Sequence, residues 1–179
     1  MKKTLLTPPS STSSSSSSTS NSSTITANTD ISSSSLSSPL RILLVDDNVI
    51  NLQLLKKIIQ MNFNIQYMDI AYDGYEALQY LQHQLYDLIL LDIDMPRLNG
   101  IETTRYIRMK SHQGTTTMTM VPILDGNRNT PIIAVTTNDS IEAIELYQQV
   151  GMDGCISKPV IPHQLKSQLL QFLENTLLC

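Results

Sequence analysis

Residues 88–100 read LILLDIDMPRLNG. The apolar start suits a strand that is buried on both faces, and Asp92 ends the run. Pro96 and the pair Asn99-Gly100 then predict a loop before the next helix. This stretch therefore predicts a parallel strand that delivers a carboxylate to one edge of a sheet.

Three further segments have the same form, an apolar run that ends in a polar residue. The polar residues are Asp46 and Asp47 after residues 42–45, Thr136 after residues 131–135, and Lys158 after a short strand at residues 155–156. The carboxyl ends of parallel strands lie at one edge of the sheet, where ligands of such sheets bind. We therefore expect three carboxylates, a hydroxyl and an ammonium group to meet at that edge.

The rest of the folded region alternates strands with amphipathic helices. The predicted strands are residues 40–45, 66–71, 88–92, 132–135 and 155–156, and the predicted helices are residues 48–61, 75–84, 101–109, 141–150 and 161–174. Such an alternation predicts an α/β fold, a doubly wound five-stranded parallel sheet with helices on both faces.

The spacing of apolar residues also predicts which side of each helix faces the core. The expected inward residues are Ile50, Leu54, Ile58 and Met61 in the first helix, Ala77, Leu78 and Leu81 in the second, Ile141, Ile144 and Leu146 in the fourth, and Leu165, Leu169, Leu170 and Leu173 in the last. Asn48 is expected to cap the first helix, and Gly151 to end the fourth.

Two segments stand outside this pattern. Residues 1–38 are mostly Ser, Thr and Asn, and they cannot bury enough apolar surface to offset backbone ordering of about 1–2 kcal/mol per residue. We therefore predict a disordered tail, followed by one domain over residues 39–179. Residues 111–130 have no clear period and exceed the usual connection of about 2–6 residues, so we predict an insertion that forms a surface loop.

Composition argues against several function classes. No apolar core follows Met1, so a signal peptide is not expected, and no apolar run approaches the roughly 20 residues that cross a bilayer. The net charge of -4 disfavours direct nucleic-acid binding. Cys155 and Cys179 have no metal-ligand spacing and suggest a reducing compartment. We expect a cytoplasmic or nuclear protein that contacts neither membrane nor nucleic acid directly.

The residues expected at the sheet edge suggest one kind of chemistry. Three close carboxylates would repel one another unless a divalent cation lay between them, and Mg2+ prefers such oxygen ligands. A carboxylate beside the cation can attack a phosphoryl group, whose oxygens then need charge compensation. Asp92 is the candidate nucleophile, Asp46 and Asp47 the candidate metal ligands. Lys158 and Thr136 would contact the phosphoryl oxygens.

These motifs resemble the receiver domains of two-component response regulators, the CheY-like family. The matching residues are the pair Asp46-Asp47, Asp92 in the pattern D-I-D-M-P-x-L-N-G, Thr136 at the end of P-I-I-A-V-T, and Lys158-Pro159. The resemblance covers residues from about Leu40 to the C-terminus, which is the whole predicted domain. All the motifs occur in the family's order and on the expected strands, so the match is specific.

The resemblance implies a flavodoxin-like fold and a phosphoryl switch that is not a turnover enzyme. Asp92 would accept a phosphoryl group from a histidine kinase or a histidine phosphotransfer protein. Mg2+ would be held by Asp47, Asp92 and the backbone carbonyl of Asp94, with Asp46 acting partly through water. Phosphorylation would pull Thr136 toward the phosphoryl oxygen and shift the surface around the fourth helix and fifth strand, which a downstream protein target would read. The family often has a cis peptide before the proline of its Lys-Pro pair.

The sequence also departs from the family's pattern. The family usually has Tyr or Phe three residues before its lysine, and here that position holds Cys155. The usual coupling between the threonine and this aromatic residue is therefore not expected. The insertion at residues 111–130 is a second departure. Asp94 and Asn138 occupy positions at which the family tunes the lifetime of the phosphoryl group.

Two alternatives compete with a phosphorelay receiver. A haloacid-dehalogenase-like phosphatase would use Asp92 as nucleophile and Asp94 as general acid, but Pro96 stands where such enzymes have Thr or Val. The other alternative is a receiver-like docking module that is never phosphorylated. It remains an alternative because Cys155 replaces the aromatic residue that the family's switch uses. The Ser-rich tail is more common in eukaryotic proteins, so the expected setting is a fungal-type stress-signalling relay.

Overall fold

The computed structural model describes residues 39–109 and 122–177. The predicted disordered tail at residues 1–38 and most of the predicted insertion therefore lie outside the described residues. Within the described part, the elements alternate as the sequence predicts, with one added 3-10 helix before the fourth strand.

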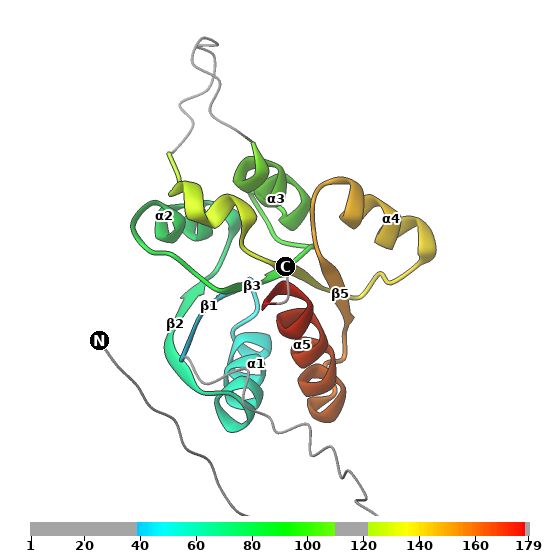
Figure 1. The fold of residues 1–179 in the computed structure, drawn as a ribbon. Helices are drawn as coiled ribbons and strands as arrows, with labels where there is room; N and C mark the ends of the chain where they lie inside the picture. The colour runs from blue at the N-terminus through cyan, green and yellow to red at the C-terminus, as the bar shows by residue number, and fades with distance from the viewer. Residues whose placement is uncertain (1–38, 110–121, 178–179) are drawn as a thin grey trace, which may run out of the picture. The chain divides into compact units, whose positions relative to one another are not determined.

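A parallel sheet forms the centre of the domain (Figure 1). Its strands are β1 (Leu40–Val45), β2 (Ile65–Ala71), β3 (Leu88–Asp92), β4 (Ile132–Thr136) and β5 (Gly154–Ser157). Their order across the sheet is β2-β1-β3-β4-β5, and each neighbouring pair is parallel. From β1 the chain therefore winds outward to β2 on one side and then through β3 and β4 to β5 on the other side. The predicted doubly wound five-stranded sheet is confirmed.

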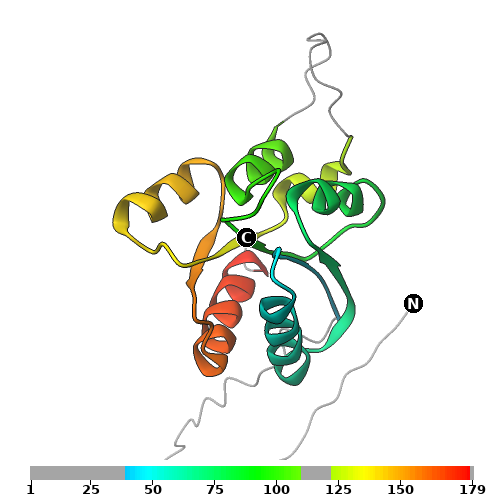
Figure 2. The same cartoon turned by 180° about the vertical axis from the view of Figure 1, so that it is seen from behind.

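Helices cover both faces of this sheet (Figures 1 and 2). They are α1 (Val49–Asn62), α2 (Gly74–His83), α3 (Gly100–Arg108), α4 (Ile141–Gln149) and α5 (Pro162–Leu177), with η1 (Asp125–Asn129) before β4. α1 and α5 pack on one face, and α2, α3 and α4 pack on the other. The inner strands β3 and β4 are buried along their whole length, which explains their nearly continuous apolar sequence.

The starts of the helices follow from local sequence. The side chain of Asn48 accepts from the backbone N–H of Ile50 and caps α1, as predicted. Asn99 and Glu102 form a capping box at the start of α3. Gly151 ends the turn after α4 with a φ of 98°, a left-handed conformation that glycine adopts readily.

The predicted inward face of α1 is wrong. Ile50 and Met61 are 74% and 76% exposed, and Leu54 is also exposed. The helix instead buries Leu52, Leu55, Ile58 and Ile59 against α5 and the sheet. α1 carries apolar residues around most of its circumference, so its periodicity fits two stripes equally well. Packing of the neighbouring elements decides between them.

The predicted inward face of α4 is also wrong. Ile141 is 74% exposed, Leu146 is exposed and Ile144 is half-buried. α4 instead buries Ala143 and Tyr147, which are four residues apart on one face of the helix. Both residues belong to the core cluster on this face of the sheet, and neither a small residue nor a tyrosine stands out in a count of strongly apolar positions. The inward residues predicted for α2 and α5 are correct, except that Leu170 is only half-buried. In α1 the prediction is correct at Ile58 alone.

The end of the predicted insertion is not a surface loop. Ile123 is buried, and η1 brings the side chain of Asn127 into the core with no exposed surface. This amide donates to the carbonyl oxygens of Leu81 and Gln84 at 2.9 and 2.7 Å. Its oxygen accepts from the backbone N–H of Tyr86 at 3.1 Å. The segment therefore closes the connection between α2 and β3, which no period in the sequence could indicate.

Candidate functional site

The polar residues expected at the sheet edge meet there. Asp92 and Thr136 are the last residues of β3 and β4, and Asp46 directly follows β1. Lys158 follows β5, where its backbone N–H donates to the carbonyl of Thr136 at 2.7 Å. The bond between Lys158 and Pro159 is cis, as the resemblance implied. Parallel strand register thus brings distant parts of the chain to one place.

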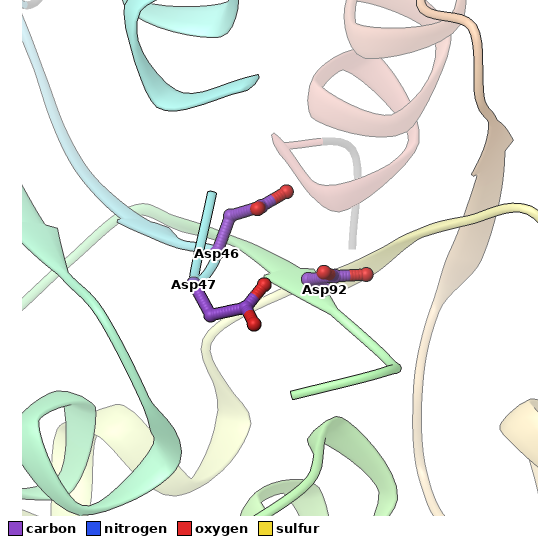
Figure 3. Close-up of side chains that lie close together, drawn as sticks. All are labelled: Asp46, Asp47 and Asp92. Carbon is purple, nitrogen blue, oxygen red and sulfur yellow. The ribbon is translucent and has the colours of Figure 1, made fainter. Parts of the chain in front are cut away.

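Three carboxylates form a compact cluster at this edge (Figure 3). Asp46, Asp47 and Asp92 each offer an oxygen, and these oxygens lie within 4.8 Å of one another. Asp46 and Asp92 are buried, whereas Asp47 is exposed. The cluster is therefore open to solvent on the side of Asp47 and closed by protein on the other side.

Lys158 bridges the two buried carboxylates. Its Nζ lies 2.9 Å from Oδ2 of Asp46 and 2.9 Å from Oδ1 of Asp92. Burial lowers the pKa of the Lys158 ammonium, but its hydrogen bonds to Asp46 and Asp92 outweigh this effect and the pKa is raised. The ammonium group therefore stays charged at the sheet edge.

The pKa of Asp92 is raised. Burial of its carboxylate is the largest cause, and repulsion by Asp46 acts in the same direction. The hydrogen bond from Lys158 and the backbone N–H of Asp94, which lies 3.4 Å from Oδ1 of Asp92, oppose this effect without cancelling it. An ionised Asp92 is thus under-compensated by the protein, which suits a site completed by a cation.

Asp46 is held rigidly, and part of this arrangement escaped the sequence reasoning. Asn51 in the first turn of α1 donates its side-chain amide to both oxygens of Asp46 at 3.2 Å. The backbone N–H of Asn48 adds a bond of 2.8 Å. Asn51 lies five residues after Asp46, in the first turn of the helix that follows the acid pair. An amide at that position is the sequence feature that could have indicated this contact.

Close backbone packing fixes the loop after Asp92. A Cβ atom added to Gly100 would lie 2.3 Å from the carbonyl oxygen of Asp92. The backbone N–H of Gly100 also donates to Ile93 at 3.0 Å, which folds the loop back on β3. Asp94 is exposed in this loop. Glycine at position 100 therefore has a steric reason, and it places the start of α3 directly beside the phosphoacceptor candidate.

Thr136 is fully buried at the end of β4. Its Oγ1 accepts from the backbone N–H of Asn138 at 3.1 Å and lies 3.4 Å from the phenol oxygen of Tyr147 on α4. Tyr147 is a second residue that the sequence reasoning missed, since its helix was expected to face the core with other residues. Cys155 is half-buried and packs against the same core cluster.

Comparison with known proteins finds the same kind of domain that this geometry indicates. A family model described as response regulator receiver domain matches residues 42–170. Histidine kinase 5 of Arabidopsis thaliana is 35% identical over 161 residues, covering 83% of this chain and 17% of that protein. Stress response regulator protein 1 of Candida albicans is 30% identical over 135 residues, covering 75% and 41%. The chain thus spans less than half the length of these relatives.

Solved structures show the same likeness. The receiver domain of sensor histidine kinase PA1611 from Pseudomonas aeruginosa, described with a magnesium ion coordinated in its active site cleft, is 28% identical with a TM-score of 0.61. That match covers 76% of this chain and 99% of the other. Chemotaxis response regulator CheY4 of Vibrio cholerae is 27% identical with a TM-score of 0.63, covering 75% and 99%. Among the described residues, no helix combines the length and apolarity needed to cross a bilayer.

Proposed function

Because this chain belongs to the family of response regulator receiver domains, whose function is phosphorelay signalling, we propose that Asp92 accepts a phosphoryl group from a phosphohistidine. One observation carries the proposal. The buried carboxylate of Asp92 lies among two further carboxylates and one ammonium group, at the edge of the sheet where the strands deliver their polar residues. Receiver domains are in general phosphoacceptor switches, so we do not propose a turnover enzyme.

The roles of the side chains follow from their positions. One oxygen of Asp92 attacks phosphorus, the P–N bond to the donor imidazole breaks, and the imidazole leaves with its electron pair. Lys158 already touches Asp92 and compensates the charge of the phosphoryl oxygens as they arrive. The hydroxyl of Thr136 donates to one of these oxygens once the phosphoryl group is in place.

The site fits a Mg2+ ion. Its donors are the hard carboxylate oxygens of Asp46, Asp47 and Asp92, and burial raises the pKa of Asp92, so a bound cation would favour the charged form of that carboxylate. Asp47 and Asp92 would hold the ion with the backbone carbonyl of Asp94, and Asp46 would act partly through water. When bound, Mg2+ supplies positive charge to the phosphoryl oxygens. Asn51 and Lys158 keep Asp46 oriented toward the site throughout.

A partner can approach over the start of α1. Val49 and Ile50 are 50% and 74% exposed, and they directly follow the acid pair and its cap. Leu54 extends this apolar surface by one helical turn. We propose that a histidine kinase or histidine phosphotransfer protein covers these residues while its phosphohistidine reaches Asp92. Such burial of Ile50 would provide affinity that a small-molecule donor does not need.

The setting is proposed from the relatives. Stress response regulator protein 1 of Candida albicans and transcription factor SKN7 of Saccharomyces cerevisiae, which is 29% identical over 152 residues, favour a fungal-type stress relay in the cytoplasm or nucleus. A downstream protein would read the switched surface, without direct contact to nucleic acid or membrane. The phosphatase that would use Asp94 as general acid is not favoured, because the family model that matches this chain is that of the receiver domain.

Phosphotransfer tests this proposal. A radiolabelled phosphohistidine donor and Mg2+ should label the wild-type chain, and Asp92→Asn should stay unlabelled. Ile50→Asp should slow transfer from the protein donor while leaving labelling by acetyl phosphate unchanged, because only the protein donor needs the apolar surface. Labelling of Asp92→Asn at the wild-type level would refute the assignment of Asp92. No labelling of the wild type by any donor would favour the docking module.

A further inference from the structure

Tyr147 occupies an unusual place for a polar group. It is 3% exposed, lies in the core cluster beneath α4, and has its hydroxyl beside the end of β4. The hydroxyl donates to the backbone carbonyl of Asn138 at 3.0 Å. The same oxygen lies 3.4 Å from Oγ1 of Thr136. The phenol therefore connects α4 both to the hydroxyl of Thr136, which is the proposed sensor of the phosphoryl group, and to the loop that follows β4.

The protons of these two hydroxyls can be assigned by elimination. The proton of Tyr147 goes to the carbonyl of Asn138, so its oxygen can only accept from Thr136. Oγ1 of Thr136 accepts from the backbone N–H of Asn138 and has one proton to give. That proton can go to the phenol oxygen of Tyr147 or to a phosphoryl oxygen, but not to both.

From this exclusive choice we propose that Tyr147 is a positioning residue, which holds Thr136 in the unphosphorylated domain and transmits its release to α4. The inference rests on the proposed function, since it needs a phosphoryl group on Asp92 to compete for Thr136. At 3.4 Å the contact is long for two hydroxyls, so Thr136 is held weakly and can be recruited. When it leaves, α4 loses its direct contact with the side chain of the sensor.

The surroundings direct this change to α4. The loop between β4 and α4 is fixed at its far end, where Ser157 donates to Asp139 at 2.6 Å and Ser140 caps the helix. Asn138 is thus the loop residue whose backbone bonds both side chains: its N–H donates to Thr136, and its carbonyl accepts from Tyr147. Cys155 has no hydroxyl or ring to reach the sensor, so the aromatic contact to Thr136 comes from the helix instead of from β5.

The test compares wild type, Tyr147→Phe and Tyr86→Phe in the full chain, each titrated with beryllofluoride in Mg2+ and followed by amide NMR. Beryllofluoride mimics the phosphoryl group. Tyr147→Phe removes the competing acceptor, so beryllofluoride should bind about twofold more tightly, the lower end of the range of one neutral hydrogen bond because the contact is long. The amide shifts of α4 on binding should shrink. Tyr86→Phe removes a buried hydroxyl that bonds Asp69 at 2.7 Å, remote from Thr136, and should match wild type.

A double-mutant cycle completes the test. In a Thr136→Ala background there is no proton to release, so adding Tyr147→Phe should leave beryllofluoride affinity unchanged. An equal gain in both backgrounds, or a Tyr147→Phe variant identical to wild type in affinity and α4 shifts, would overturn the role of Tyr147 and leave the receiver function intact. A wild type that binds no beryllofluoride would overturn the proposed function itself, and this inference with it.

Discussion

Replacing Asp92 by Asn should stabilise the metal-free domain at neutral pH, although it abolishes phosphoryl acceptance. The structure indicates the sizes of the opposing terms. Nζ of Lys158 lies 2.9 Å from Oδ1 of Asp92, and the Coulomb attraction at that distance is about 6 kcal/mol at an effective dielectric constant of about 20. Asp46 repels it across at most 4.8 Å, about 3.5 kcal/mol on the same scale, and exposed Asp47 adds a screened repulsion. These two terms leave a net attraction of at most about 2.5 kcal/mol, which the repulsion by Asp47 reduces further, so the burial cost of the carboxylate decides the sign.

That cost is visible in the raised pKa of Asp92. A carboxyl group whose pKa is raised on folding lowers stability when ionised, so this loss is absent below its unfolded-state pKa and grows as the pH rises through the folded one. Asp92→Asn removes the loss, while Lys158 keeps Asp46 as its partner at 2.9 Å. We expect a gain of about 0.5–2 kcal/mol at pH 7, which is about 3 °C in Tm per kcal/mol for a domain of this size.

Thermal and urea unfolding of both proteins in EDTA, at pH 7 and near pH 4, measure this gain. The advantage of Asp92→Asn should shrink at the lower pH, where wild-type Asp92 takes up its proton. It should also shrink in Mg2+, because the ion stabilises wild type more and a concentration of ten times Kd contributes about 1.4 kcal/mol. A variant that is less stable than wild type in EDTA at pH 7 would refute the reasoning.

Three further predictions concern residues around the site and the core. Asn127→Ala should lower the free energy of unfolding, measured in urea, by about 2–4 kcal/mol, because three backbone groups lose their hydrogen-bond partner. Phosphoryl labelling of the folded variant should persist, and its loss would contradict a purely structural role. Asn51→Ala should weaken Mg2+ binding about tenfold in calorimetry, whereas Asn62→Ala at the other end of α1 should not, and equal effects would argue against orientation of the acid. Gly100→Ala should lower stability by about 1–3 kcal/mol, since its Cβ would meet the carbonyl oxygen of Asp92 at 2.3 Å, and an unchanged melting temperature would disprove that packing.

Much of the architecture could be predicted because parallel strands buried on both faces read as apolar runs with polar ends. The run before Asp92 shows this directly, and each such end lies at the same edge of the sheet. Capping chemistry added a helix start at Asn48, whereas the cap at Asn99 was expected only as part of a loop. These features depend on local sequence and on one general rule about parallel sheets, so no tertiary knowledge was needed.

The remaining features depend on tertiary contacts. α1 offers two apolar stripes, and only its neighbours decide that Leu52 and Leu55 are buried while Ile50 is exposed. Asn127 lies in a segment without a period, yet it satisfies three backbone groups 41 to 46 residues away. Tyr147 touches Thr136 only because α4 buries the face that carries Ala143 and Tyr147. None of these pairings has a spacing that a sequence pattern could show.

The central claim is that Asp92 is the phosphoacceptor of a Mg2+-dependent receiver. The most direct measurement is incubation of the full chain with a labelled phosphohistidine donor and Mg2+, followed by mapping of the modified residue by mass spectrometry. One acyl phosphate should be found on Asp92, and it should form neither in EDTA nor in Asp92→Asn. A phosphoryl group found on another residue, or labelling that persists in Asp92→Asn, would contradict it.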